Sequence, residues 1–271
     1  MKHIKVTFTL DGHTHADVLI ALLSGIGFDG FEETDQALLA YTEEENYDKQ
    51  LLNDIAMKQD VVYETEVIEP QNWNAIWESN FQPVIVDDFC TLRAHFHDME
   101  VTTPHEIVIT PKLSFGTGHH ATTQLMIMGM KNMPFAGKTV LDFGTGTGIL
   151  AILAEKLGAL KITAIDNDSW SVENTIENAA RNNSDNIVVK ESTLEQMGDE
   201  TYDVILANIN RHILLRYMSQ LYKRINAGGA ILMSGLLCED KEIIVKAAQE
   251  AGFQYRQLSE KNNWIAIFFD K

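Results

Sequence analysis

Glycines 144, 146 and 148 stand at every second position of the segment LDFGTGTGIL (141–150), directly behind a short apolar run. A glycine-rich turn between a strand and a helix lets backbone N–H groups approach a nucleotide ligand closely. Such a turn serves dinucleotides and S-adenosylmethionine equally well, so the turn alone leaves both ligands open. A dinucleotide fingerprint requires G-x-G-x-x-G, however, and Ile149 stands where its last glycine would be, which disfavours NAD.

Two polar side chains close apolar runs that we expect to be strands of one sheet. Asp166 follows the run 161–165, where a carboxylate accepts hydrogen bonds from ribose hydroxyls. An acid at this place is common to NAD enzymes and adenosylmethionine enzymes, so Asp166 predicts a ribose without choosing between them. Asn208 closes the run 203–207 at the sheet edge where ligands bind, and it is harder to reconcile with NAD.

The elements that carry these residues alternate between strands and helices from about residue 84 onward. Apolar runs lie at 139–143, 161–165, 187–189, 203–207 and 229–234, and helical patterns lie at 149–157, 169–182, 211–224 and 239–250. This alternation predicts an α/β fold with a doubly wound parallel sheet. The runs 253–258 and 264–269 are separated only by SEKNN, so we expect an antiparallel hairpin, which is typical of the seven-stranded methyltransferase sheet.

The first 68 residues have a different pattern. Strand-like stretches are found at 3–10, 28–31, 37–41 and 61–68, and helical stretches at 18–26 and 47–57. This order predicts a small ferredoxin-like α+β domain. We therefore divide the chain into a small domain at 1–68, a tryptophan-bearing connector at 69–83 and a larger α/β domain at 84–271.

Acidic residues dominate the charge of the chain. Lys and Arg total 21 against 39 Asp and Glu, a formal net charge of −18, which argues against a nucleic-acid backbone as the principal partner. A stretch within 29–48 contains eight acidic residues and no basic residue before Lys49. A run of this kind is usually only a solvated face, and the alternative is a docking surface for a basic protein.

Several classes of protein are disfavoured by composition. No uninterrupted apolar run approaches the roughly 20 residues that span a bilayer, and the N-terminus alternates like a strand where a signal peptide would be continuously apolar. We expect a cytoplasmic protein without a membrane partner. Cys90 and Cys238 lie far apart without a CxxC motif, so neither a disulfide framework nor a zinc site is expected, and we predict no metal.

Four segments together resemble a known family. They are FGTGHHATT (115–123), LDFGTGTGIL (141–150), AIDND (164–168) and DVILANI (203–209). In these segments the chain is similar to the ribosomal protein L11 methyltransferases, the PrmA family, and the FGTG-x-H-x-T-T stretch is the most specific of them. The acidic N-terminal domain and the connector are similar as well, so the resemblance covers nearly the whole chain.

The resemblance implies S-adenosyl-L-methionine as the methyl donor and a basic partner, ribosomal protein L11, as the substrate. The family methylates lysine ε-amines and the N-terminal α-amine of that protein. The resemblance implies that Thr123, Gly144, Asp166 and Asn208 contact the donor. We add Gly146, the second glycine of the loop, to this set. Phe115 would begin a loop over the methyl donor, and Asn208 and His120 are the candidates for a catalytic role.

The chain departs from the family pattern at two places. Thr145 and Thr147 stand where the glycine loop often has Cys and Ser, and NINR (208–211) stands where many members have Asn-Ile-Leu-Ala. Another protein, an RNA or a small molecule remains an alternative substrate, whereas glutamine methyltransferases would have Asn-Pro-Pro-Tyr at 208–211. A binding module that kept the fold and lost catalysis is the alternative from a different class.

Overall fold

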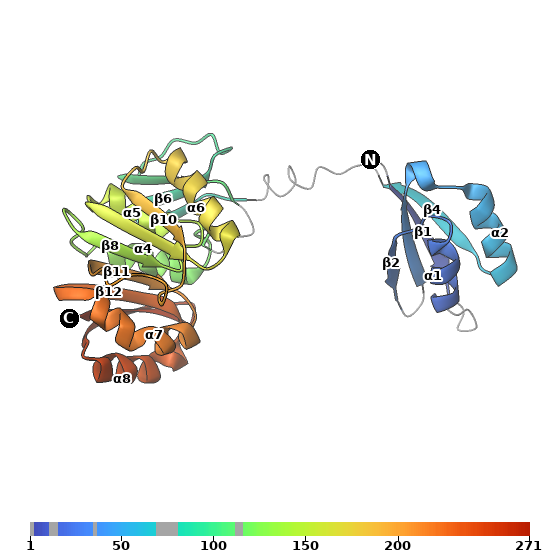
Figure 1. Cartoon of the computed structure of the whole chain (residues 1–271). Helices are drawn as coiled ribbons and strands as arrows, with labels where there is room; N and C mark the ends of the chain where they lie inside the picture. Colours follow the sequence, from blue (N-terminus) through green and yellow to red (C-terminus); the bar gives the residue numbers. More distant parts are fainter. Residues whose placement is uncertain (1–2, 11–15, 35–36, 69–80, 112–115) are drawn as a thin grey trace. The chain divides into compact units, whose positions relative to one another are not determined.

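The computed structural model of the chain describes residues 3–10, 16–34, 37–68, 81–111 and 116–271. The chain divides into two compact units, Met1–Asn80 and Phe81–Lys271 (Figure 1). The boundary falls within the connector predicted at 69–83, most of which lies outside the described residues, as does Phe115. Within the described ranges, no helix is long and apolar enough to cross a bilayer.

The first unit contains a four-stranded antiparallel sheet with the strand order β2-β3-β1-β4. Its elements are β1 (His3–Thr9), α1 (Ala16–Ser24), β2 (Gly30–Glu33), β3 (Ala37–Glu43), η1 (Glu44–Asn46), α2 (Lys49–Gln59) and β4 (Tyr63–Ile68). Alternate residues of β1, namely Ile4, Val6 and Phe8, are buried in one cluster with Leu19 and Leu23 of α1. This order of elements and strands is the ferredoxin-like arrangement that the sequence predicts.

The second unit is built on a seven-stranded sheet with the order β10-β9-β8-β11-β12-β14-β13. Its strands are β8 (Thr139–Phe143), β9 (Lys161–Asp166), β10 (Ile187–Glu191), β11 (Tyr202–Asn208), β12 (Ile225–Leu237), β13 (Gln254–Lys261) and β14 (Trp264–Asp270). Its helices are α4 (Ala121–Met130), α5 (Ile149–Lys156), α6 (Ser169–Arg181), α7 (Arg211–Arg224), η2 (Cys238–Asp240) and α8 (Lys241–Ala251). β14 pairs antiparallel with both β12 and β13 and the other pairs are parallel, which confirms the predicted hairpin and sheet.

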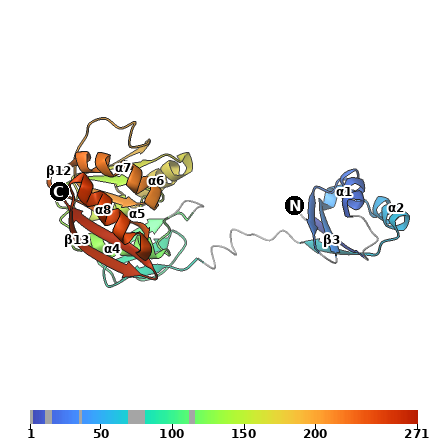
Figure 2. The ribbon, with the colours of Figure 1, turned by 90° about the horizontal axis from the view of Figure 1, so that it is seen from below.

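Helices cover both faces of this sheet. Val204 and Leu206 of β11 belong to the hydrophobic cluster that contains α4 and α5, whereas Ile205 and Ala207 belong to the cluster that contains α7 and α8. Figure 2, which views the chain from below, has α8 in front of the sheet. Because both faces are buried, the central strands are continuous apolar runs, which is why they were recognisable in the sequence.

Residues 84–109 form a separate small sheet that the sequence interpretation did not predict. β5 (Val84–Val86) pairs antiparallel with β6 (Cys90–Ala94), and β6 pairs parallel with β7 (His105–Ile109). The strand order β5-β6-β7 makes β7 an edge strand. The expectation that the βαβ alternation starts at about residue 84 is therefore wrong, since the alternation begins with β8.

Candidate active site

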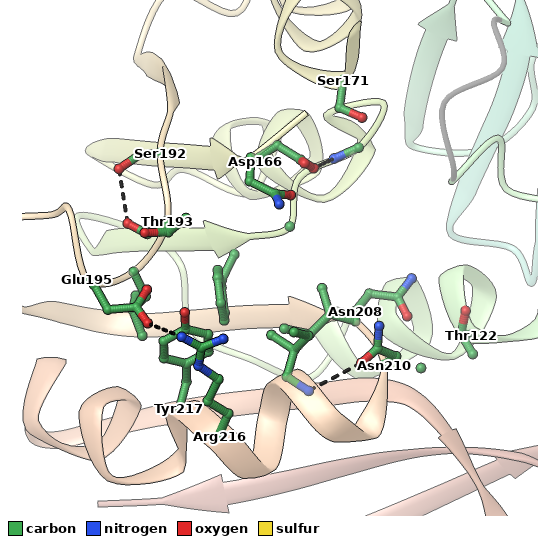
Figure 3. A pocket seen from close by; sticks show the side chains of 18 of the residues that line it. Thr122, Asp166, Ser171, Ser192, Thr193, Glu195, Asn208, Asn210, Arg216 and Tyr217 are labelled. Atoms are coloured by element: carbon green, nitrogen blue, oxygen red, sulfur yellow. Dashed lines mark hydrogen bonds and ion pairs between the residues drawn. The ribbon is translucent and has the colours of Figure 1, made fainter. Parts of the chain in front are cut away.

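A pocket of about 940 Å³ lies at the carboxyl ends of the parallel strands. Phe143 lines it from the end of β8. Asp166 and Asn208, both labelled in Figure 3, line it from the ends of β9 and β11. The strand order reverses between β8 and β11. Open α/β sheets bind their ligands at such a switch point, so this pocket is the candidate active site.

The glycine loop after β8 has a backbone that other residues adopt only with strain. Gly144, Gly146 and Gly148 have φ angles of 77°, 58° and 81°. A Cβ atom on Gly144 would lie 2.3 Å from Cγ2 of Ile209, and one on Gly148 would lie 2.8 Å from Cγ2 of Thr175. All three glycines therefore serve the turn, and Gly144 and Gly148 also allow the close packing of its neighbours.

The Asp166 carboxylate is hydrogen-bonded to the glycine loop. Its Oδ2 accepts the Gly146 N–H at 3.0 Å, and its Oδ1 accepts the Asp168 N–H at 3.1 Å. The cap of α6 is supplied by Asp168, whose side chain accepts the N–H groups of Trp170 and Ser171. Each carboxylate oxygen has more than one acceptor site, so Asp166 can hold the loop and also accept hydroxyl groups of a ligand.

Asn208 lines the pocket and has a buried hydrogen-bond acceptor. The residue lines the cavity, and its Oδ1 atom accepts no hydrogen bond from the described residues. A buried amide oxygen without a donor costs about 1–3 kcal/mol, and such groups in folded proteins call for a specific explanation. A ligand N–H or O–H group would satisfy this atom.

The segment that leads into α4 forms another wall of the pocket. His120 is the N-cap of α4, and its Nδ1 contacts the Thr122 hydroxyl at 2.8 Å. The His120 ring meets Trp264 edge to face, with 4.6 Å between centroids. Thr122 lines the pocket, whereas Thr123 is 1% exposed, is not part of the lining, and has a hydroxyl without a hydrogen-bond partner among the described residues.

Several parts of the lining were not named from the sequence, among them the segment after β10 and the start of β14. Ser192 and Thr193 follow β10, and their position after a parallel strand was a usable signal, because the carboxyl ends of such strands meet at one edge of the sheet. Trp264 starts β14 and reaches the pocket because it pairs with Leu237 of β12. That pairing joins two distant segments, so no local pattern predicts the place of the indole.

The side of the pocket near α7 has an ion pair. The Arg216 guanidinium donates to Glu195 Oε1 at 3.0 Å. A hydrogen bond from the Tyr217 hydroxyl, together with Arg216, holds the pKa of Glu195 below its usual value. Glu195 therefore keeps its negative charge at neutral pH.

A buried carboxyl group, Asp142, lies beneath the glycine loop. It is fully buried in β8, and its Oδ2 accepts the Thr145 hydroxyl at 2.7 Å. Burial raises the pKa of Asp142 to about 7, and the nearby Asp166 adds to the increase, while the hydrogen bonds from Thr145 and the Ala151 amide oppose it. Asp142 is thus protonated well above the pH at which an exposed aspartate ionises.

The chain is similar to proteins of one described family along nearly its whole length. The family model described as ribosomal protein L11 methyltransferase (PrmA) matches residues 27–271. A ribosomal protein L11 methyltransferase from Porphyromonas gingivalis is 40% identical over 283 residues, which cover 99% of this chain and 98% of that protein. A relative with the same description from Chlorobaculum tepidum is 36% identical, covering 99% of this chain and 96% of that protein.

A solved structure has a similar fold over part of this chain. The crystal structure of a ribosomal protein L11 methylase from Lactobacillus delbrueckii subsp. bulgaricus matches with a TM-score of 0.66 and 31% identity. The match covers 70% of this chain and 98% of that chain. Sequence and structure therefore point to the same family.

The titration of Asp142 predicts a pH dependence of stability. The folded-state pKa of about 7 exceeds the ordinary value of 3.8, so the folded state binds more protons between these values and loses stability from Asp142 as pH rises from about 4 to about 7. The side-chain amide of an Asp142→Asn variant can still accept the Thr145 hydroxyl but does not titrate. Urea unfolding at pH 5 and pH 8 should show the variant gaining stability relative to the wild type at the higher pH. An equal difference at both pH values would contradict the assignment.

Proposed function

The chain belongs to the ribosomal protein L11 methyltransferase family, PrmA, and we propose that it transfers methyl groups from S-adenosylmethionine to amines of ribosomal protein L11. The acceptors are lysine ε-amines and the N-terminal α-amine, as the family resemblance implies. The observation that carries the proposal is the buried Asn208 Oδ1, which lacks a donor among the described residues and lies in a pocket beside the glycine loop. The reaction belongs in the cytoplasm, with no membrane or nucleic acid taking part.

The residues of the pocket fit S-adenosylmethionine, which supplies an activated methyl group when bound. Asp166 is suited to the ribose, since its oxygens keep acceptor sites beyond the two N–H groups they bind. The glycines allow close approach of the ligand to the backbone. We propose that the donor is held by Gly144, Gly146, Asp166 and Asn208, which line the pocket, and that Phe115, as the family resemblance implies, covers the methyl group.

An attacking amine must be neutral and aligned with the methyl group. The reference pKa of a lysine amine is about 10.4, and desolvation lowers it. Phe143, Ile209 and Trp264 in the lining supply apolar surface for that desolvation. The Asn208 Oδ1 then accepts an amine N–H and orients the nitrogen lone pair. His120 Nδ1 contacts the Thr122 hydroxyl. We therefore propose that His120 fixes the position of Thr122, which lines the pocket.

The first unit is proposed to recognise the protein substrate. Its acidic run includes Glu44 and Glu45, which are exposed on η1, whereas Glu43 is half-buried at the end of β3. Asp48 has a structural role, because its side chain caps α2 by accepting the N–H groups of Gln50 and Leu51. A basic substrate would be attracted to the exposed glutamates of this run.

The proposed function predicts which macromolecule is methylated. Purified L11 and ribosomal RNA free of protein are each incubated with the full chain and donor labelled in its methyl group. We expect label in the protein alone, located by mass mapping on lysine side chains and the N-terminus. Label in the RNA alone would overturn the substrate assignment, and donor binding without transfer to any substrate would favour the binding-module alternative.

Asp166 is expected to determine donor affinity through its charge. Replacing it by asparagine should weaken binding of the donor's demethylated product by about 1.5–3 kcal/mol, roughly 10- to 150-fold in Kd, because a charged acceptor for the ribose is lost. Asp168→Asn is the matched control, since asparagine caps a helix as well as aspartate does. Calorimetry measures both. Equal affinities of the two variants would contradict the assignment of the ribose to Asp166. Binding of NAD as tight as that of the demethylated donor would contradict the choice of ligand.

The exposed glutamates of the acidic run are expected to steer the substrate. The double variant Glu44→Lys and Glu45→Lys should reduce kcat/KM for L11 roughly three- to tenfold at low salt, with the difference fading as salt screens the charges. The control carries Glu242→Lys and Glu250→Lys, which make the same change in net charge on exposed positions of α8. If the two double variants have the same salt dependence, the run serves only solubility.

A further inference from the structure

Three asparagines on α6 and at its end bind backbone groups of β7 and of Thr110, which follows it. Asn174, Asn178 and Asn182 follow one another at four-residue spacing, so they lie on one face of the helix. Asn182 accepts the Val108 N–H at 2.9 Å and donates to the Val108 carbonyl at 2.7 Å. At Thr110, the N–H donates to Asn178 Oδ1 at 2.7 Å, and the carbonyl accepts Asn174 Nδ2 at 3.1 Å. A primary amide carries the same donor and acceptor as a peptide group, so the three side chains take the place of a neighbouring strand.

Asn178 differs from the other two because it also reaches the glycine loop. Its Nδ2 donates to the Thr147 carbonyl at 2.8 Å. Thr147 in turn donates its hydroxyl to the Gly116 carbonyl at 2.7 Å. Three consecutive hydrogen bonds thus connect Thr110 to Gly116 through Asn178 and Thr147. Asn178 is 0% exposed and Thr147 is 1% exposed, so water does not compete for these bonds.

The carbonyl groups of the loop are directed at α6 as well. Thr175 donates its hydroxyl to the Gly146 carbonyl at 2.9 Å, next to the bond between Asn178 and Thr147. Side chains of α6 thus bind the carbonyls of Gly146 and Thr147. These bonds fix the orientation of the loop, in which Gly144 and Gly146 line the pocket. Side chains that are absent from the pocket lining therefore determine how the loop faces a ligand.

We propose that Asn178 and Thr147 are positioning residues for the methyl donor, which lock the glycine loop, Thr110 and Gly116 into one unit. This inference rests on the proposed function, because it takes the pocket to be the donor site. Neither residue lines the pocket, so both act through the backbone that they hold. Satisfying the edge of β7 would not require the bond to the glycine loop, since Asn182 serves that edge without one.

The experiment measures the affinity of the full chain for the demethylated donor by calorimetry, alongside thermal unfolding. Thr147→Val keeps the shape of the side chain and removes the hydroxyl, and Asn178→Ala removes the amide. Each of these two variants should weaken binding of the demethylated donor about five- to tenfold, which corresponds to the net free energy of about one hydrogen bond. The conservative Thr147→Ser retains the hydroxyl and should stay within about twofold of the wild type.

Asn182→Ala is the matched control, because it loses bonds to β7 but none to the glycine loop. It should lower the unfolding temperature while leaving the affinity within about twofold of the wild type. The proposal is overturned if Thr147→Val binds as tightly as the wild type, or if Asn182→Ala weakens binding as much as Asn178→Ala. Should Asn178→Ala fail to fold, the comparison of Thr147→Val with Thr147→Ser decides alone. Absence of binding by the wild type would instead refute the donor assignment.

In steady-state methylation of L11, the same variants should raise the KM for the donor about five- to tenfold and change kcat less than twofold. A residue that merely stabilises the fold would not alter the donor KM under conditions where the chain is folded. An unchanged KM together with a reduced kcat would show that Thr147 and Asn178 act on another step and would overturn the proposal.

Discussion

The backbone of the glycine loop is the constraint on which the catalytic unit depends. The loop has three positive φ angles within five residues, and neighbouring atoms leave no room for a side chain at Gly144 or Gly148, so these positions require glycine. This conformation brings the loop against Ile209 at the end of β11 and allows the Gly146 N–H to bind the Asp166 carboxylate. Strand ends that are adjacent in the sheet thereby become the walls of one cavity.

Carboxyl groups support this loop from two sides, and their environments differ. Asp142 lies below the loop in a fully buried position, whereas Asp166 is partly exposed at the pocket. Because burial raises the pKa of Asp142 to about 7, the group carries a proton at mildly acidic pH, and repulsion between the two carboxylates is avoided there.

The parts of the molecule that could be predicted from the sequence are those that depend on local pattern. Strands buried on both faces are continuous apolar runs, and Asp166 and Asn208 could be placed because each ends such a run. The β5-β6-β7 sheet could not be predicted from the sequence because its strands are short and one of its pairings is parallel and nonlocal. Which of Thr122 and Thr123 faces the pocket depends on the rotation of α4 about its axis, and packing against distant strands sets that rotation.

The asparagine side chains on α6 also protect an edge strand from pairing with other protein molecules. An edge strand with free N–H and C=O groups is a template for strands of other chains, and proteins protect such edges to avoid aggregation. At Val108 and Thr110 the outward backbone groups of β7 and its continuation are already hydrogen-bonded within the chain. The small sheet is thereby closed to intermolecular strand addition at this edge, and the protection is built from uncharged side chains in a molecule whose net charge is strongly negative.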